Sequence, residues 1–264
     1  MTSFLESMIA RAKADKQTIV LAEGDDPRTL EAAETILAQD VANLIILGDV
    51  EGIKASGRNL EGAQLVDPRT SELAAEFADT FYELRKNKGM TPEKAAETVK
   101  DVLYFGVMMV KTGRADGMVA GACHATGDVL RPSLQILKTA PGVKLVSSFF
   151  IMVVPNCEYG QDGTFLFSDC GLEIQPDAEK LAHIAVNSAK SWKNLIGTDP
   201  VVAMLSHSTY GSAKNDDQAK VAQAAAIARE LAPELALDGE LQADAAMVPS
   251  VGASKAPDSK VAGH

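Results

Sequence analysis

The loop SHSTYGSAKND (206–216) gathers four short hydroxyl side chains within seven residues: Ser206, Ser208, Thr209 and Ser212. Gly211 in the same loop lets the backbone approach a ligand closely. The loop follows a strand-like run and leads into a helix, and hydroxyls with free N–H groups at a helix start bind anions without net positive charge. We therefore predict an anion site here. A polar loop that uses serines as caps and turn residues would have the same composition.

A second candidate site is GACHATGDVLRPSLQ (121–135), where small residues end a strand and a helix follows. We expect Thr126 to cap that helix, with Arg131 further along it. Arginine is the side chain best shaped for two-point contact with phosphate. The alternative is a capped helix whose Arg131 pairs with Asp128 or is solvated. We interpret His124, which has no visible nucleophile partner, as a structural residue.

Three positive charges lie close together in YELRKNKGMT (82–91), at Arg85, Lys86 and Lys88. They suit an anionic ligand, but basic residues near a helix C-terminus also complement the helix dipole. Two other segments carry weaker signals. Arg28 in AEGDDPR (22–28) is interpreted as a helix-start residue, and Asp169 is either a site carboxylate or a turn residue.

Composition narrows the class of ligand. The 264 residues include 25 Lys and Arg against 36 Asp and Glu, a net charge of −11. Nucleic acid is therefore not an expected partner, whereas a small anion held by local charges is compatible with this balance. The cysteines at 123, 157 and 170 fit no zinc-ligand spacing. No dinucleotide fingerprint, phosphate loop or nucleophile elbow is present.

Membrane and secretory signals are also missing from the sequence. The longest apolar run, 145–155, falls short of the roughly 20 residues that cross a bilayer. The N-terminal residues contain no unbroken apolar stretch, so no secretory signal is visible. We expect a cytoplasmic protein that has no membrane partner.

Strand and helix patterns alternate along the chain, which favours an α/β fold with a mostly parallel sheet and helices on both faces. The strands are expected at 18–22, 42–47, 117–122, 144–153, 164–167 and 201–205, with 164–167 pairing with 144–153. The helices are expected at 2–14, from Pro27, and at 71–86, 92–110, 176–195 and 216–231, the fourth with a break near Gly106. We predict two domains, 1–144 and 145–264. In such sheets ligands bind at the carboxyl ends of the strands.

Five stretches, in order along the chain, resemble the phosphate acetyl/butyryl transferase family. They are LAEGDDPRTLEAA, YELRKNKGMTPEKA, GACHATGDVLRPSLQILKTAPG, LSHSTYGSAKNDD and DGELQADAAMVPSVGASKAPDSKVAG. The resemblance implies an acyltransferase of acetate metabolism that interconverts acetyl-CoA plus phosphate with acetyl phosphate plus CoA. Coenzyme A would be a substrate, and no metal or other cofactor would be bound permanently. It also implies a homodimer and an architecture similar to isocitrate and isopropylmalate dehydrogenases.

The resemblance also implies roles for particular residues. Arg85 and Arg131 would bind coenzyme A and position its reacting end, with Thr126 beside them. The acyl-phosphate end would bind at the hydroxyl loop, through Ser206, Ser208, Thr209, Gly211 and Ser212. Many members carry Phe and Lys in that loop where this chain has His207 and Tyr210. The thiolate of coenzyme A would attack the acetyl carbonyl directly in a ternary complex, without an acyl-enzyme.

Members of the family continue for some tens of residues beyond the position of His264. Their thiol base, an aspartate, and a neighbouring serine and arginine lie in that part, so the resemblance assigns no catalytic residue within 1–264. We therefore expect a shortened member with an incomplete second domain, whose first domain lacks the C-terminal segment that completes it in the family. Two alternatives stay open: a phosphate butyryltransferase with a longer acyl pocket, and a non-catalytic protein that binds CoA or acyl phosphate.

Overall fold

The computed structural model describes residues 3–264, and they divide into two compact units. The first unit is Glu6–Lys138, and the second contains Thr139–His264 together with the described residues 3–5. Helix α1 spans Ser3–Ala14, while Thr2, where we expected this helix to begin, lies outside the described residues. The domain division at 144 and 145 stays a prediction.

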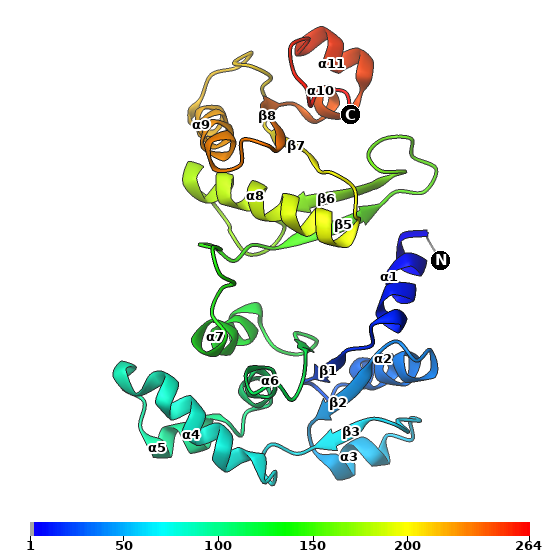
Figure 1. The fold of residues 1–264 in the computed structure, drawn as a ribbon, viewed down its shortest axis with the longest axis vertical. Coiled ribbons are helices and arrows are strands. Elements are labelled where there is room, and N and C mark those ends of the chain that lie inside the picture. Colours follow the sequence, from blue (N-terminus) through cyan, green and yellow to red (C-terminus); the bar gives the residue numbers. More distant parts are fainter. Residues whose placement is uncertain (1–2) are drawn as a thin grey trace. The chain divides into compact units, whose positions relative to one another are not determined.

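The first unit is built on a four-stranded sheet in the order β3-β2-β1-β4 (Figure 1). All its pairs are parallel. Its strands are β1 (Thr18–Leu21), β2 (Asn43–Leu47), β3 (Gln64–Val66) and β4 (Gly117–Val119). Because β1 and β4 are neighbours in register, the segments that follow Leu21 and Val119 leave the sheet at the same edge.

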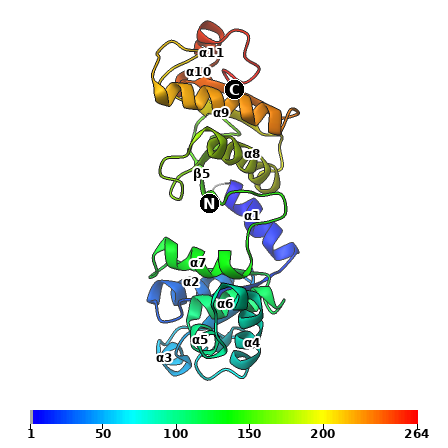
Figure 2. The same ribbon diagram turned by 90° about the vertical axis from the view of Figure 1, so that its left-hand side faces the viewer.

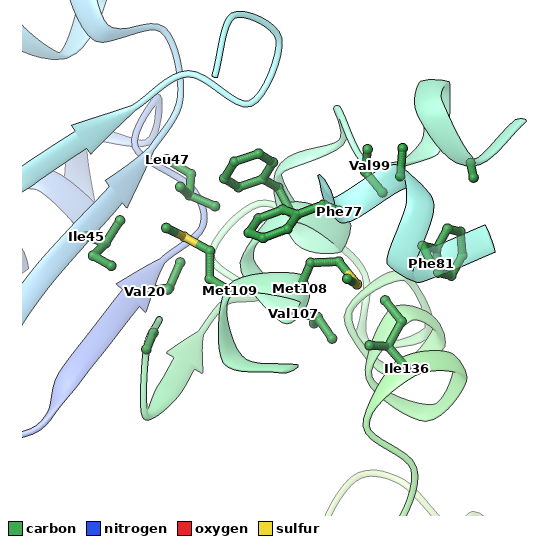
Figure 3. Packing of buried hydrophobic residues seen from close by; sticks show 14 residues of the cluster. Val20, Ile45, Leu47, Phe77, Phe81, Val99, Val107, Met108, Met109 and Ile136 are labelled. Carbon is green, nitrogen blue, oxygen red and sulfur yellow. The ribbon is translucent and has the colours of Figure 1, made fainter. Parts of the chain in front are cut away.

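Helices cover both faces of this sheet. They are α2 (Pro27–Ala38), α3 (Val50–Ala55), α4 (Leu73–Arg85), the 3₁₀ turn η1 (Lys86–Lys88), α5 (Pro92–Thr98), α6 (Val102–Lys111) and α7 (Thr126–Ile136). Val20 and Ile45 pack with Phe77 on one face, as Figure 3 shows. Ile46 packs with Leu30 on the other face, because successive strand residues point to opposite sides. The expected α/β fold with a parallel sheet flanked by helices is confirmed.

The helix expected over 92–110 is two helices, and the predicted break near Gly106 is wrong. Asp101 ends the connection between α5 and α6, and its carboxylate accepts the backbone N–H groups of Leu103 at 2.9 Å and Tyr104 at 3.2 Å. Gly106 lies inside α6 against the sheet. A Cβ there would lie 2.6 Å from the Met118 sulfur, so glycine allows the helix to approach the strands.

The second unit contains two small sheets and a pair of packed helices. Strands β5 (Phe149–Val153) and β6 (Thr164–Ser168) form an antiparallel pair, whereas β7 (Val201–Leu205) and β8 (Ala236–Leu241) are parallel. Helices α8 (Ala178–Leu195) and α9 (Asp216–Leu231) pack on each other (Figure 2). Their alanine-rich faces form one core with Met204 and Leu237.

Some elements differ from the sequence-based expectations. The strand expected over 144–153 is extended and paired only from Phe149 onward. Strands β3 and β8 and helix α3 were not expected, nor were α10 (Ala243–Met247) and α11 (Pro249–Lys255). Leu241, Ala246 and Val261 form a small core under these last two helices. Among the described residues, no helix is both long and apolar enough to cross a membrane.

Candidate functional site

The carboxylate of Glu23, which follows strand β1, organises the loop that follows β4. Glu23 is only 5% exposed. One carboxylate oxygen, Oε2, accepts the backbone N–H groups of Gly121 at 2.9 Å and Ala122 at 2.7 Å. The other, Oε1, accepts those of Cys123 at 2.9 Å and His124 at 3.1 Å. Four successive N–H groups on one carboxylate fix the path of the chain into helix α7.

These hydrogen bonds keep Glu23 ionised. Burial alone would raise its pKa, but the bonds from the Cys123 N–H, the His124 side chain and the Ala122 N–H lower the pKa to about 2. The Nδ1 of His124 lies 2.7 Å from Oε1 of Glu23, so this histidine contacts a buried carboxylate, as a structural histidine would. The sequence analysis missed Glu23, whose signal was an acidic residue directly after a buried strand.

Arg28 adds a second tie to the same loop. It lies in the first turn of α2, whose N-cap is Asp26, so its expected place at a helix start is correct. Its Nη2 lies 2.7 Å from the Asp26 carboxylate and donates to the carbonyl of Ala122 at 2.5 Å. The residues before α7 are therefore held both through their N–H groups and through a carbonyl.

Helix α7 begins at Thr126, and the expected role of Thr126 as its cap is wrong. Ala125 is the N-cap and makes no side-chain hydrogen bond, while its carbonyl accepts the N–H of Asp128 at 2.9 Å. The Thr126 hydroxyl is exposed and has no hydrogen-bond partner within residues 3–264. Arg131 is also exposed, and Asp128, at 3.4 Å, is its ion-pair partner. Both predicted binding residues on α7 thus face solvent.

The positive charges of Arg85 and Arg131 both interact electrostatically with the hydroxyl of Tyr104 on α6. Burial raises the pKa of this tyrosine, and the positive charges of Arg131 and Arg85 oppose the rise. The hydroxyl donates to Oε1 of Gln135 on α7 at 3.2 Å. Arg85 is half-buried, and its guanidinium makes no ion pair with any described residue. The structure therefore brings the two predicted arginines to one region of the first unit.

In the second unit, two hydroxyl groups of the 206–216 loop are buried and form hydrogen bonds that hold the loop in place. Ser208 is 0% exposed, and its Oγ lies 3.1 Å from Oε1 of Glu240 and accepts the N–H of Ala213 at 3.1 Å. Thr209 is 5% exposed, and its Oγ1 accepts the N–H of Gln242 at 2.9 Å. These contacts fix the loop to strand β8 and to the residue that follows it.

The other predicted residues of this loop lie closer to solvent. The Ser206 hydroxyl accepts the N–H of Ser208 at 3.3 Å, and the exposed Ser212 hydroxyl accepts the N–H of Thr209 at 3.1 Å. Gly211 has a φ of +77°, the left-handed region that favours glycine. The structure brings all five predicted residues of this loop together, with Ser206, Gly211 and Ser212 on its more accessible side.

Two acidic residues of β8, Asp238 and Glu240, were missed by the sequence analysis and support this loop. Glu240 is 3% exposed and accepts the N–H of Gly211 at 2.6 Å. Asp238 accepts the Tyr210 hydroxyl and the Ser259 hydroxyl, each at 2.5 Å, and pairs with Arg229. Burial opposes ionisation of both carboxyls, yet their hydrogen bonds lower both pKa values.

Asp169 holds a turn. Its carboxylate accepts the hydroxyl of Ser148 at 2.6 Å and the N–H groups of Ser148, Gly171 and Leu172, each at 2.8 Å. Burial would raise its pKa, but these four bonds lower it well below the usual range. All four donors belong to its own unit, so the turn interpretation explains this residue.

A cavity of about 400 Å³ lies elsewhere in the second unit. Its lining is largely apolar and includes Leu166, Trp192, Val201 and Met247. None of the predicted site residues lines it. Its position gives no support to a catalytic role for this cavity.

Comparison with known proteins shows the family to which this chain is similar. The profile of one family, Phosphate acetyl/butaryl transferase, matches residues 3–264. A phosphate acetyltransferase from Acetivibrio thermocellus is 57% identical over 99% of this chain and 79% of its own length. The solved EutD phosphotransacetylase from Staphylococcus aureus superposes with a TM-score of 0.88 at 42% identity, covering 99% of this chain and 79% of that one. A phosphotransacetylase from Streptococcus pyogenes gives a TM-score of 0.91 at 41% identity, covering 100% and 80%.

Proposed function

Because the chain belongs to the Phosphate acetyl/butaryl transferase family, we propose that it interconverts acetyl-CoA and phosphate with acetyl phosphate and CoA. The relatives named phosphate acetyltransferase are transferase enzymes, and this chain aligns with them over almost its whole length. Coenzyme A is then a substrate of the protein, and phosphate is the second one.

The observation that carries this proposal within the structure is the pair Arg85 and Arg131. Both charges act on the Tyr104 hydroxyl, and neither is neutralised by a buried carboxylate among the described residues. Coenzyme A carries phosphate groups, which guanidinium groups bind through charge-assisted hydrogen bonds. The free hydroxyl of Thr126 at the start of α7 adds a donor to this region. We assign these three side chains to coenzyme A.

We assign the acyl-phosphate end to the 206–216 loop. Ser206 and Ser212 would contact the ligand, while Ser208 and Thr209 hold the loop through their bonds to Glu240 and Gln242. A loop that is fixed before the substrate arrives loses little conformational entropy on binding. The carboxylates of Asp238 and Glu240 accept hydrogen bonds from Tyr210 and Gly211. Their oxygens therefore face these donors within the protein and are not presented to an anionic ligand.

The chemistry is a direct transfer. The coenzyme A sulfur, after loss of its proton, attacks the acetyl carbonyl of acetyl phosphate and forms a tetrahedral oxyanion. The oxyanion collapses, the bond between the acetyl carbon and the phosphate oxygen breaks, and the thioester and phosphate are released. Fixed guanidinium and N–H donors stabilise the negative charge on the oxyanion and on the leaving phosphate.

No acyl-enzyme is needed in this scheme. Desolvation and the hydrogen bond to Glu23 raise the pKa of Cys123, which keeps this cysteine protonated at neutral pH. A thiol is a poor nucleophile compared with a thiolate, so Cys123 is not set up to accept the acetyl group.

The test is release of free CoA thiol from acetyl-CoA that depends on added phosphate or arsenate. A folded sample that releases thiol only at the background rate would refute catalysis by this chain. Comparing acetyl-, propionyl- and butyryl-CoA then measures the acyl preference, and faster turnover of butyryl-CoA would favour the butyryl alternative. Binding of CoA in calorimetry without turnover would favour a non-catalytic binding protein.

We further propose that the protein acts in acetate metabolism as a homodimer in the cytoplasm, which the family resemblance supports. Sedimentation equilibrium of the purified chain tests the dimer, and a single species at the mass of one chain would contradict it. Fractionation of cells that make the protein tests its location, which recovery outside the cytoplasm would contradict.

A further inference from the structure

Three different metal-ligating side chains meet where β1 and β4 end. Nδ1 of His124 lies 2.7 Å from Oε1 of Glu23. Sγ of Cys123 lies 3.5 Å from the same oxygen and 3.7 Å from Nδ1 of His124. The proposed transfer of an acetyl group uses none of these three side chains.

The spacing of the three atoms matches one bound metal ion. Three points separated by 2.7, 3.5 and 3.7 Å share a centre about 2 Å from each of them. Zinc binds nitrogen and oxygen ligands at about 2.0–2.2 Å and sulfur at about 2.3 Å. An ion slightly out of the plane of the three atoms would therefore meet all three bond lengths without a change of the loop.

The donor set favours a particular class of metal. One imidazole nitrogen, one thiolate sulfur and one carboxylate oxygen are borderline and soft ligands that suit Zn²⁺ and Co²⁺. Mg²⁺ and Ca²⁺ prefer sites made of oxygen atoms alone. The cluster therefore selects a zinc-like divalent ion over the common hard cations.

The loop is held in this geometry without any metal. Glu23 is buried, and its Oε2 is occupied by the N–H groups of Gly121 and Ala122. Its Oε1 accepts the N–H groups of Cys123 and His124, which places this oxygen beside both side chains, while Arg28 holds the carbonyl of Ala122. Binding a metal would thus order little of the chain.

The cluster is also reachable from solvent. Cys123 is exposed, and the His124 side chain is 29% exposed. Three protein ligands with an open position are the arrangement of zinc sites that keep one bound water. A metal ion has access to the cluster, and a water molecule has access to the metal.

We propose that Glu23, Cys123 and His124 form a binding site for one Zn²⁺ ion. Zinc takes the place of the hydrogen on the Cys123 sulfur, and that proton goes to solvent. Neutral His124 binds zinc through the lone pair of Nδ1 and carries its one hydrogen on Nε2, and no electron is transferred. Sequence motifs of structural zinc sites, which are based on closely spaced cysteines and histidines, would not detect this site. Two of its ligands are adjacent in the sequence, and the third lies far from them.

The experiment is a titration of the purified chain with Co²⁺, followed by absorption, and then displacement by Zn²⁺. One equivalent of Co²⁺ should produce a thiolate-to-cobalt charge-transfer band, which Zn²⁺ should abolish. Cys123→Ser should remove the band. It should also weaken Zn²⁺ binding, measured by competition with a chromophoric chelator, at least about tenfold, since losing even an outer partner of a ligand costs about 10–100-fold. Serine preserves the size and the hydrogen bond of the thiol, so this variant is expected to fold.

The chain supplies matched controls. Cys170→Ser and His207→Asn change the same residue types elsewhere and should leave the cobalt band and the Zn²⁺ affinity unchanged, whereas His124→Asn should weaken both. A wild-type chain without the charge-transfer band would overturn the proposal. So would an equal loss of Zn²⁺ affinity in Cys123→Ser and Cys170→Ser.

Discussion

Oε1 of Glu240 accepts the backbone N–H of Gly211 at 2.6 Å, and the same oxygen lies 3.1 Å from the buried hydroxyl of Ser208. A carboxylate inside strand β8 therefore fixes the loop that carries the predicted phosphate-binding hydroxyls. Burial works against its charge, but the Gly211 N–H and further hydrogen bonds lower its pKa, so Glu240 is ionised at neutral pH.

Replacing this carboxylate should loosen the loop. Glu240→Gln keeps the shape of the side chain but removes the charge that strengthens the bonds from Gly211 and Ser208. We expect the free energy of unfolding to fall by about 1–3 kcal/mol. Urea denaturation at pH 7 measures the change. Glu234→Gln, at an exposed position just before β8, is the matched control and should be neutral. Equal stability of the two variants would show that the Glu240 charge does not hold the loop.

Replacing a threonine by valine should lower the stability of the protein at position 209 but only the binding of CoA at position 126. Thr209→Val leaves the part-buried N–H of Gln242 without its acceptor, which should lower the free energy of unfolding by about 1–3 kcal/mol. Thr126→Val removes an exposed hydroxyl that contacts no described residue, so the stability should stay the same while the KM for CoA rises. Denaturation and steady-state kinetics of both variants measure this contrast. A destabilised Thr126→Val variant with unchanged KM would contradict the assigned role.

Asp169 should make part of the stability depend on pH. Four donors outweigh burial and hold its pKa below the unfolded value of about 3.9. The stabilisation is therefore fully present above about pH 5 and is lost as the pH falls below about 4 toward the folded pKa. Asp169→Asn, which cannot accept all four bonds, should be less stable by about 1–3 kcal/mol at neutral pH.

The difference between wild type and Asp169→Asn should shrink as the pH falls from about 5 to 3. Denaturation curves across this range measure it. Asp162→Asn is a suitable control, because Asp162 is an exposed aspartate in the connection between β5 and β6. A deficit of Asp169→Asn that stays constant down to pH 3 would show that its charge contributes nothing.

The central strands and the α/β fold could be predicted because they depend on regular patterns of apolar residues along the sequence. The runs TIVLA and ANLIIL are mostly apolar and contain β-branched residues, and they form the two central strands of the first unit. The alternation of strands and helices predicted the α/β fold. In this fold the loops that follow strand ends, such as those after Leu21 and Leu205, are where ligands bind. These features depend on neighbours in the sequence, which one chain is enough to reveal.

Features that depend on distant partners could not be predicted. Gly106 looked like a helix breaker because glycine costs about 1 kcal/mol in a helix, whereas its role is close packing against Met118. Asp238 and Glu240 looked like ordinary acidic residues, since their donors on the 206–216 loop and at Arg229 and Ser259 are found only in the folded chain. A buried carboxylate requires partners that its own segment does not show.

The arginine pair Arg85 and Arg131 should contribute directly to the binding of coenzyme A. Arg131 is exposed on α7, where its ion pair with Asp128, at 3.4 Å, is long and solvated and so contributes little to stability. Arg131→Ala should therefore leave the fold intact while weakening coenzyme A binding by about 1–3 kcal/mol, the range for losing a charge-assisted contact. Calorimetry with CoA and the KM for CoA measure the loss. Arg85→Ala should act in the same direction, because both guanidinium groups act on the Tyr104 hydroxyl.

Variants of two other arginines test whether the loss of CoA binding in Arg131→Ala comes from a local contact or from the lower positive charge of the protein. Among the described residues Arg69 forms its ion pair with Asp67, two residues away, so Arg69→Ala should leave CoA binding unchanged although it removes the same charge. Arg28→Ala should have a smaller effect than Arg131→Ala, because Arg28 acts on the ligand only through the Ala122 carbonyl. Faster hydrogen exchange at residues 121–124 would report that indirect effect. If Arg69→Ala weakened binding as much as Arg131→Ala, the net charge of the protein would explain the data, and the assignment of Arg131 to coenzyme A would be wrong.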